Sequence, residues 1–251
     1  MSSSESLDKN QPLEDHLAEL RKRLINIIII IFIGFIVCWN FSEIIFEIIR
    51  KPISPHLPTG GLVFTAPMDK FLAHIKVSLF AGMVVSCPLW IYQLWAFIAP
   101  GLYRKEKKYS LVFMFAGTCL FLTGVSFVYF VVYPLAFDFL MNFGGGEDKP
   151  MITINEYLSF FTTTTLVFGA VFEMPLIFAI LAMMGIVEKQ MLVKFRRFAI
   201  VILAACSAIF TPPDVISMIL MMIPMLLLYE ISVFLVGVLE PPPIDEDLED
   251  T

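Results

Sequence analysis

The chain has 251 residues, of which 58% are hydrophobic and only 16% are charged. Soluble domains usually have about 45–50% apolar and about 25% charged residues, so this composition excludes an ordinary water-soluble globule. Six hydrophobic spans of roughly 20 residues would use most of the chain, which predicts an all-α integral membrane protein with six transmembrane helices. The formal net charge of −6 comes from residues 240–251, which hold six acids and no base, so no basic surface for nucleic acid is expected.

The expected organisation has three parts. Residues 1–11 form a polar N-terminal tail, residues 12–239 form a single six-helix transmembrane domain, and residues 240–251 form an acidic, disordered cytoplasmic tail. The first tail has no apolar stretch behind it, so it is neither a signal peptide nor a transit peptide.

The transmembrane domain is expected to open with an interfacial helix. Leu13, Leu17, Leu20 and Leu24 are spaced by four, three and four residues, which places them on one face of a helix. Charged residues occupy the rest of the circumference. This pattern predicts an amphipathic helix that lies along the membrane surface before the chain enters the bilayer.

The six spans are expected at residues 24–45, 72–98, 109–133, 157–184, 198–210 and 215–239. A segment rich in Pro and Gly separates the first two spans, which predicts an irregular loop. The fifth span has only 13 residues and would reach about 20 Å, against a hydrocarbon thickness of about 30 Å. A short fifth span that turns sharply at Pro212 and Pro213 predicts a bundle of uneven height, concave on one side.

The distribution of Lys and Arg orients these spans. Most of the bases lie in the N-terminal segment and in the second and fourth loops, which share one side of the membrane. By the positive-inside rule that side is the cytoplasm. Because the number of spans is even, we expect both termini to be cytoplasmic.

Glu173 is the acid that membrane insertion disfavours most. It lies near the middle of the fourth span, where a charged side chain costs about 3 kcal/mol on insertion scales. Pro175 cannot donate to the carbonyl of Val171, so an unpaired backbone acceptor lies close by. We interpret Glu173 as a functional intramembrane site; the alternative is a neutral structural acid hydrogen-bonded to a neighbouring helix.

Other polar residues have ordinary explanations when only the local sequence is considered. Glu19 faces Arg23 four residues later, which suits a simple helical ion pair. Glu106 is a lone acid among four bases. Gln93 lies beside aromatic residues typical of the membrane boundary, and Asp214 suits a helix N-cap.

The sequence shows no pattern typical of a soluble enzyme. The three His and four Cys residues have no metal-ligand spacing, and GxSxG, HExxH, P-loop and GxGxxG motifs are absent. We therefore expect no metal, no cofactor and no catalytic residues. An unusual intramembrane enzyme stays an alternative, although Glu173 is the only deep ionisable residue that it could use.

Five motifs stand out in order along the chain: residues 16–24, residues 86–88 with 92–103 and 106, residues 129–135, residues 168–175 and residues 211–214. Together they resemble TatC, the multispanning subunit of the twin-arginine protein translocase. Together they extend over roughly residues 12–239. The resemblance implies six helices in a concave, glove-like bundle with short fifth and sixth helices, in the bacterial cytoplasmic (inner) membrane.

The resemblance also implies a function. It indicates a non-enzymatic receptor for twin-arginine signal peptides and the core subunit of a translocase that exports folded proteins with the proton gradient. Glu19 and Glu106 fall where the family's arginine-recognising acids lie, and a carboxylate can hold a guanidinium bidentately. Arg21, Phe97 and Tyr103 are expected to complete the signal-peptide site.

A second expected site serves a partner helix. Glu173, Gln93 and Tyr129 match intramembrane polar positions where small single-span Tat subunits of the TatA/TatB type are expected to dock. The positions matched to structure or assembly are Pro52, Pro88, Pro100, Pro134, Pro175, Pro212, Pro213 and Asp214. The main rival function is a proton-coupled secondary transporter in which Glu173 is the protonation site. Such transporters usually have repeated halves, and no repeat is visible here.

Overall fold

The computed structural model describes residues 5–57, 61–98, 110–142, 151–210 and 215–239. These residues form helices and one isolated parallel bridge between Val63 and Thr153, with no β-strand among them. The predicted all-α architecture is therefore confirmed. The chain divides into two compact units, residues 1–170 and residues 171–251.

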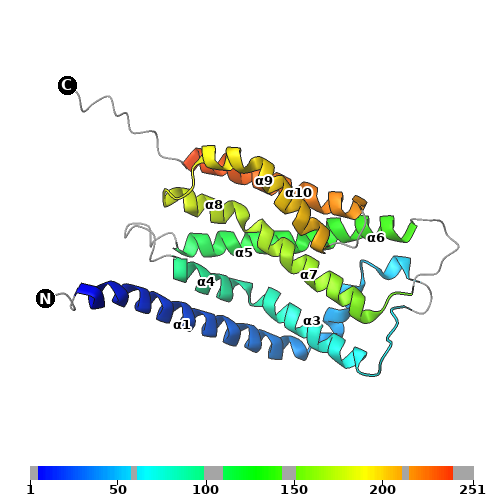
Figure 1. Cartoon of the computed structure of the whole chain (residues 1–251). Helices are drawn as coiled ribbons and strands as arrows, with labels where there is room; N and C mark the ends of the chain where they lie inside the picture. The colour runs from blue at the N-terminus through cyan, green and yellow to red at the C-terminus, as the bar shows by residue number, and fades with distance from the viewer. Residues whose placement is uncertain (1–4, 58–60, 99–109, 143–150, 211–214, 240–251) are drawn as a thin grey trace. The chain divides into compact units, whose positions relative to one another are not determined.

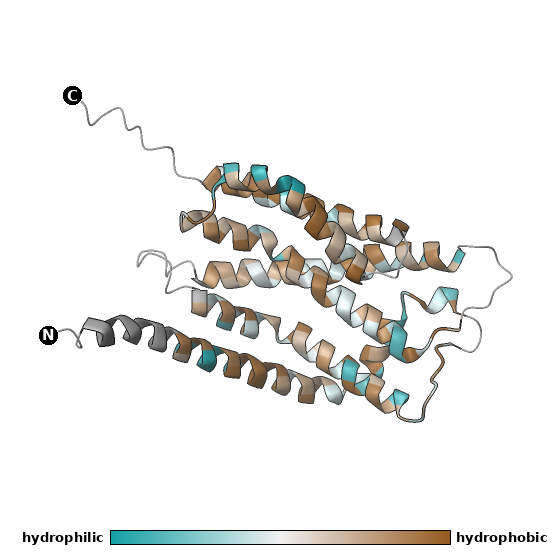
Figure 2. Cartoon of the chain, in the orientation of Figure 1, coloured by the Kyte–Doolittle hydropathy of each residue, from teal (hydrophilic) through white to brown (hydrophobic). Residues whose placement is uncertain are grey.

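The first unit begins with a single long helix, α1 (Glu5–Trp39) (Figure 1). The predicted interfacial helix is therefore not a separate element but the first part of α1. The helix ends earlier than predicted, because the chain turns at residues 40–41 and the Asn40 side chain donates to the carbonyl of Ile36 over 3.0 Å. Beyond its first turns α1 is coloured hydrophobic along most of its length (Figure 2), and side chains such as Ile28 and Phe32 are exposed, as expected for a helix that faces lipid.

Part of the predicted irregular loop is helical. The short helices α2 (Ser42–Arg50) and η1 (Ser54–His56) follow α1, and Pro52 lies in the turn between them. The helix α2 has apolar residues on one face and acids on the other, as expected for an amphipathic helix. The prediction of an irregular loop rested on the Pro and Gly residues further along the chain. The loop prediction is therefore wrong for residues 46–50, whereas residues 42–45 belong to the predicted first span.

The second predicted span is a bent pair of helices, α3 (Asp69–Val85) and α4 (Cys87–Ile98), that meet at 59°. Pro88 explains the bend, because its ring has no N–H for the carbonyl of Val84. At the same bend, the indole of Trp90 donates to the carbonyl of Met83 over 2.8 Å. Both α3 and α4 pack against α1.

The third predicted span is longer than expected. The helix α5 (Ser110–Phe127) continues through a π-helical turn, η4 (Val128–Val132), into α6 (Tyr133–Asn142). The predicted end just before Pro134 is wrong, because the wider π-turn lets the chain pass a residue that cannot donate. The last helix to begin in this unit is α7 (Ile154–Phe172).

The second unit contains α8 (Met174–Met183), α9 (Lys189–Phe210) and α10 (Val215–Leu239). Gly185 has φ of +70° and ends the fourth predicted span as expected. The helix α9 begins before the apolar stretch, since the Lys, Gln, Met and Arg residues that precede it are good helix formers. With 25 residues α10 reaches about 38 Å, so the sixth helix is not short and that expectation is corrected.

Among the described residues, length and apolar composition identify four helical stretches able to cross a membrane, and up to five if the bent α3–α4 pair is one span. The four are residues 17–39, 111–142, 154–183 and 218–239. The helix α9 is not among them, because Lys194, Arg196 and Arg197 lie within it.

Candidate functional site

A polar cluster near the middle of α1 joins Glu19, Arg23 and Gln93. Arg23 donates from Nη2 to Glu19 Oε1 over 3.2 Å and from Nη1 to Gln93 Oε1 over 3.0 Å. The first bond follows from helical spacing, since residues four apart share a face. The second bond joins α1 to α4 and depends on the tertiary fold. The side chains of Arg23 and Glu19 are 27% and 34% exposed, so the ion pair is within reach of solvent.

Glu19 also lines a shallow hollow of about 390 Å³ on α1. Its other lining residues are Ala18, Lys22, Arg23 and Asn26. A carboxylate in such a partly open hollow can accept hydrogen bonds from a second donor group. A guanidinium suits it best, because the planar fork matches both carboxylate oxygens.

The remaining residues predicted for signal-peptide binding have different outcomes. Arg21 lies exposed on α1, and Phe97 lies partly buried in the last turn of α4. Glu106 and Tyr103 lie outside the described residues, as do Pro100, Pro212, Pro213 and Asp214.

Glu173 occupies the break between α7 and α8. It stands at the N-cap position of α8, and its backbone oxygen accepts from the amide of Ile177 over 2.9 Å. Pro175 in the first turn of α8 explains the break. Both carboxylate oxygens are buried and have no hydrogen-bond partner in the described part of the chain. A buried polar group without a partner costs free energy, so Glu173 is a natural place for a ligand or partner to bind.

Gln93 and Tyr129 do not lie together. Gln93 binds Arg23, whereas the hydroxyl of Tyr129 in the π-turn donates to the carbonyl of Ile48 at the end of α2 over 2.8 Å. The structure thus places Gln93 beside Glu19. The sequence could not show this, because the residues are far apart in the chain.

Two further tyrosines had no assigned role in the sequence. The hydroxyl of Tyr133 is fully buried and lies 2.6 Å from the carbonyl oxygen of Phe161 and 2.7 Å from Thr165 Oγ1. The hydroxyl of Tyr157 donates to the carbonyl of Ile49. Tyr129 and Tyr157 therefore cap the last carbonyls of α2, which fixes this short helix against α7 and the π-turn.

Asp69, the first residue of α3, organises the chain that leads into this helix. Its Oδ2 accepts from the backbone amides of Thr65 and Ala66 over 2.9 and 2.8 Å, and from the Thr65 hydroxyl over 2.9 Å. Its Oδ1 accepts from Asn155 over 3.2 Å, and Lys76 donates to Asn155 over 2.8 Å. This network ties α3 to the start of α7.

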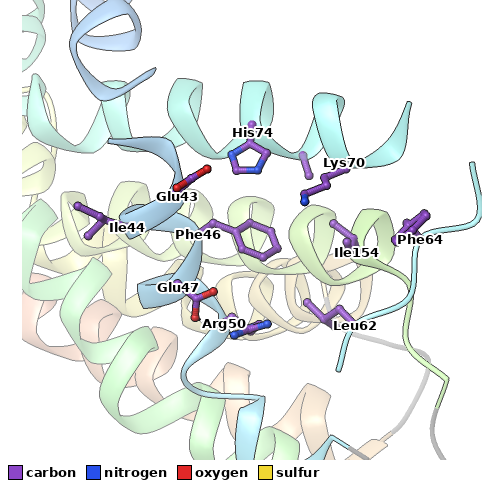
Figure 3. Close-up of a pocket in the computed structure, with 11 residues that line it drawn as sticks. Glu43, Ile44, Phe46, Glu47, Arg50, Leu62, Phe64, Lys70, His74 and Ile154 are labelled. Carbon is purple, nitrogen blue, oxygen red and sulfur yellow. Dashed lines mark hydrogen bonds and ion pairs between the residues drawn. The ribbon is translucent and has the colours of Figure 1, made fainter. Parts of the chain in front are cut away.

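A second hollow, of about 560 Å³, opens beside this network between α2, α3 and the segment around Leu62 (Figure 3). The ring of His74 stacks on Phe46 with centroids 5.8 Å apart, and Glu47 binds Arg50 over 2.8 Å. The hollow carries both signs of charge. In the described residues, no group of three His, Cys, Asp or Glu is suited to hold a metal ion.

Comparisons with known proteins point to one family. The sequence model of the family described as Sec-independent protein translocase protein (TatC) matches residues 15–224. A Sec-independent protein translocase protein TatC from Desulforapulum autotrophicum is 38% identical over 227 residues, which is 90% of this chain and 84% of the relative. A protein of the same name from Helicobacter pylori is 38% identical over 237 residues, which is 94% of this chain and 92% of the relative.

Solved structures agree with these relatives. A crystal structure of the twin-arginine translocase receptor TatC is 38% identical and has a TM-score of 0.80, over 88% of this chain and 97% of that chain. A second crystal structure of this receptor, in DDM, has a TM-score of 0.81 at 38% identity, over 88% of this chain and 98% of that chain. The similarity in sequence and the similarity in structure therefore cover nearly the same part of the chain.

Proposed function

Because this chain belongs to the TatC family of Sec-independent protein translocase proteins, we propose that it is a twin-arginine signal-peptide receptor and the core subunit of a translocase. The cargo crosses the membrane already folded, driven by the proton gradient. The relatives are named as translocase proteins and the similar crystal structure is that of a receptor, which supports a receptor rather than an enzyme or a small-solute transporter.

The membrane arrangement that we propose has six spans in the bacterial cytoplasmic membrane. The bent α3–α4 pair forms the second span and α9 forms the fifth, although its first turns are basic. The basic residues of α9 then lie at the cytoplasmic surface, together with the N-terminal end of α1. This arrangement follows the positive-inside rule and leaves both termini in the cytoplasm.

The observation that best supports arginine recognition is the contact between Glu19 and Arg23. Glu19 already accepts a guanidinium donor at the rim of an open hollow. A signal-peptide arginine has the same chemistry as Arg23, and a carboxylate holds it better than a lysine ammonium, which cannot form the planar fork. Glu106 is proposed to bind the second arginine, and Arg21, Phe97 and Tyr103 to border the peptide.

Glu173 is proposed to bind a polar residue of a small single-span Tat subunit of the TatA/TatB type. Its buried carboxylate oxygens lack a partner among the described residues. A hydrogen-bond donor on a partner helix would supply one in a low-dielectric environment, where such a bond is strong. Occupancy of the peptide site would then be coupled to recruitment of the small subunits.

The test is binding of a fluorescent twin-arginine signal peptide to the purified full-length protein in nanodiscs. Glu19→Gln and Glu106→Gln are expected to weaken binding about tenfold each, because each removes a charge-assisted bond. A twin-lysine peptide should bind more weakly than the twin-arginine peptide. The control is Glu47→Gln, which changes an exposed acid in the hollow beside α2 and should leave binding unchanged. Equal binding of both peptides by folded protein would contradict the proposal.

A further inference from the structure

Arg23 divides its guanidinium between two acceptors. One terminal nitrogen binds Glu19 Oε1 and the other binds Gln93 Oε1, over 3.2 and 3.0 Å. Glu19 thus already has a guanidinium partner from its own chain, in the hollow where the cargo arginine is proposed to bind. The two guanidinium groups would compete for one carboxylate.

We propose that Arg23 is an internal substitute for the cargo arginine: it occupies Glu19 in the empty receptor and is displaced when the signal peptide binds. This inference rests on the proposed function, since it assumes that Glu19 binds the peptide. Arg23 keeps its bond to Gln93 after displacement, so its charge is not left without a polar partner.

The geometry makes this exchange feasible. Arg23 uses only one oxygen of Glu19, and the other accepts no hydrogen bond from any residue that the structure describes. The contact is long for a charge-assisted bond and is partly exposed, so it is a weak one. A cargo guanidinium that approaches through the hollow can bind both oxygens at once, which Arg23 does not do while Gln93 holds its other nitrogen.

Selectivity for arginine comes from Glu19 itself. A lysine ammonium is a point charge that cannot form the two-pronged contact, whereas an arginine gains a second bond on Glu19. The cost of displacing Arg23 is the same for either peptide, so Arg23 weakens the binding of both by about the same factor and leaves the preference for arginine unchanged.

Gln93 has a defined part in this scheme. It is the neutral acceptor that keeps Arg23 when Glu19 changes partner. In Gln93→Leu, Arg23 has no second acceptor and stays on Glu19, so peptide affinity should fall. That fall should disappear when Arg23→Gln is added, because there is then no competing guanidinium.

The experiment compares twin-arginine and twin-lysine peptides on the full chain in nanodiscs, with helicity and melting temperature measured for every variant. In Arg23→Gln the twin-arginine peptide should bind about threefold tighter or more, because both the competitor and a like charge are removed. The twin-lysine peptide should gain by about the same factor, because either peptide has to displace the same group, so the selectivity ratio should stay the same. Lys22→Gln measures the effect of charge alone, since Lys22 lines the same hollow but has no hydrogen bond to Glu19 in the described part of the chain.

The outcomes are distinct. An affinity gain in Arg23→Gln that exceeds the gain in Lys22→Gln supports the proposal, whereas an equal gain, no gain or a loss overturns it. If Arg23→Gln does not fold, Arg23→Lys decides, because it keeps the charge but cannot bridge Glu19 and Gln93: tighter binding supports the proposal and wild-type affinity overturns it. If Glu19→Gln itself leaves binding unchanged, the proposed arginine site is wrong, and this inference is wrong with it.

Discussion

Gly34 of α1 and Gly82 of α3 meet at a crossing with no room for a side chain. A Cβ on Gly34 would lie 2.7 Å from the carbonyl oxygen of Gly82, and a Cβ on Gly82 would lie 2.5 Å from the backbone nitrogen of Phe35. Small residues let membrane helices approach closely, so that packing replaces the hydrophobic effect as the source of helix association. This crossing holds α3 against α1.

Gly82→Ala should therefore destabilise the protein by about 1–3 kcal/mol, because the helices must separate to admit the methyl group. The measurement is the melting temperature in nanodiscs. Val85→Ala is the control, since Val85 is exposed on the same helix and its truncation should have little effect. A melting temperature unchanged by Gly82→Ala would show that the crossing tolerates separation.

Tyr133→Phe should also destabilise the protein, by about 1–3 kcal/mol, because the change leaves the buried carbonyl of Phe161 and the Thr165 hydroxyl without this partner. Thermal unfolding of the purified variant measures the loss. Tyr92→Phe removes a hydroxyl from a residue that is 39% exposed and should change the melting temperature much less. Equal effects of the two substitutions would contradict a stabilising role for the hydrogen bonds of the Tyr133 hydroxyl.

Asp69→Ala should loosen the chain around Thr65. Three donors from Thr65 and Ala66 would lose their acceptor, so amide hydrogen exchange at these two residues should become faster. Mass spectrometry of exchanged peptides measures the effect. Glu43→Ala, which removes an exposed acid of α2, should leave exchange around Thr65 unchanged.

Glu173→Leu should separate stability from function. The change removes a buried carboxylate that has no partner in the described residues, so the isolated protein should become more stable by about 1–2 kcal/mol. The same change should reduce co-purification of a small single-span Tat subunit. A lower melting temperature would indicate that Glu173 has a structural partner, which is the alternative interpretation of this acid.

Local chemistry explains several features of the fold. The breaks at Pro88 and Pro175 follow from missing N–H groups, although both prolines lie inside spans that were predicted as continuous, and the predicted helix end at Gly185 follows from a positive φ. The path past Pro134 was not predictable in this way, because it depends on a π-turn that surrounding contacts hold in place. The separate helix α2 was also not predicted; its last carbonyls accept hydrogen bonds from Tyr129 and Tyr157, which are distant in sequence.

The candidate site likewise contains one contact that the sequence predicts and one that it does not. The contact between Glu19 and Arg23 follows from helical spacing and could be predicted from the sequence. The contact between Arg23 and Gln93 joins residues 70 positions apart, so only the folded chain shows it. Membership of the family supports the role that we propose for the cluster, which its local chemistry alone leaves open.

The most direct test of arginine recognition at Glu19 is site-specific photocrosslinking of a twin-arginine signal peptide. A benzoylphenylalanine would replace Ala18, which lines the hollow beside Glu19, or Phe64, which lines the hollow beside α2. We predict crosslinks to the twin-arginine peptide from position 18, lost in Glu19→Gln, and none from position 64. Crosslinks from position 64, or crosslinks from position 18 that persist without the Glu19 carboxylate, would contradict binding at this site.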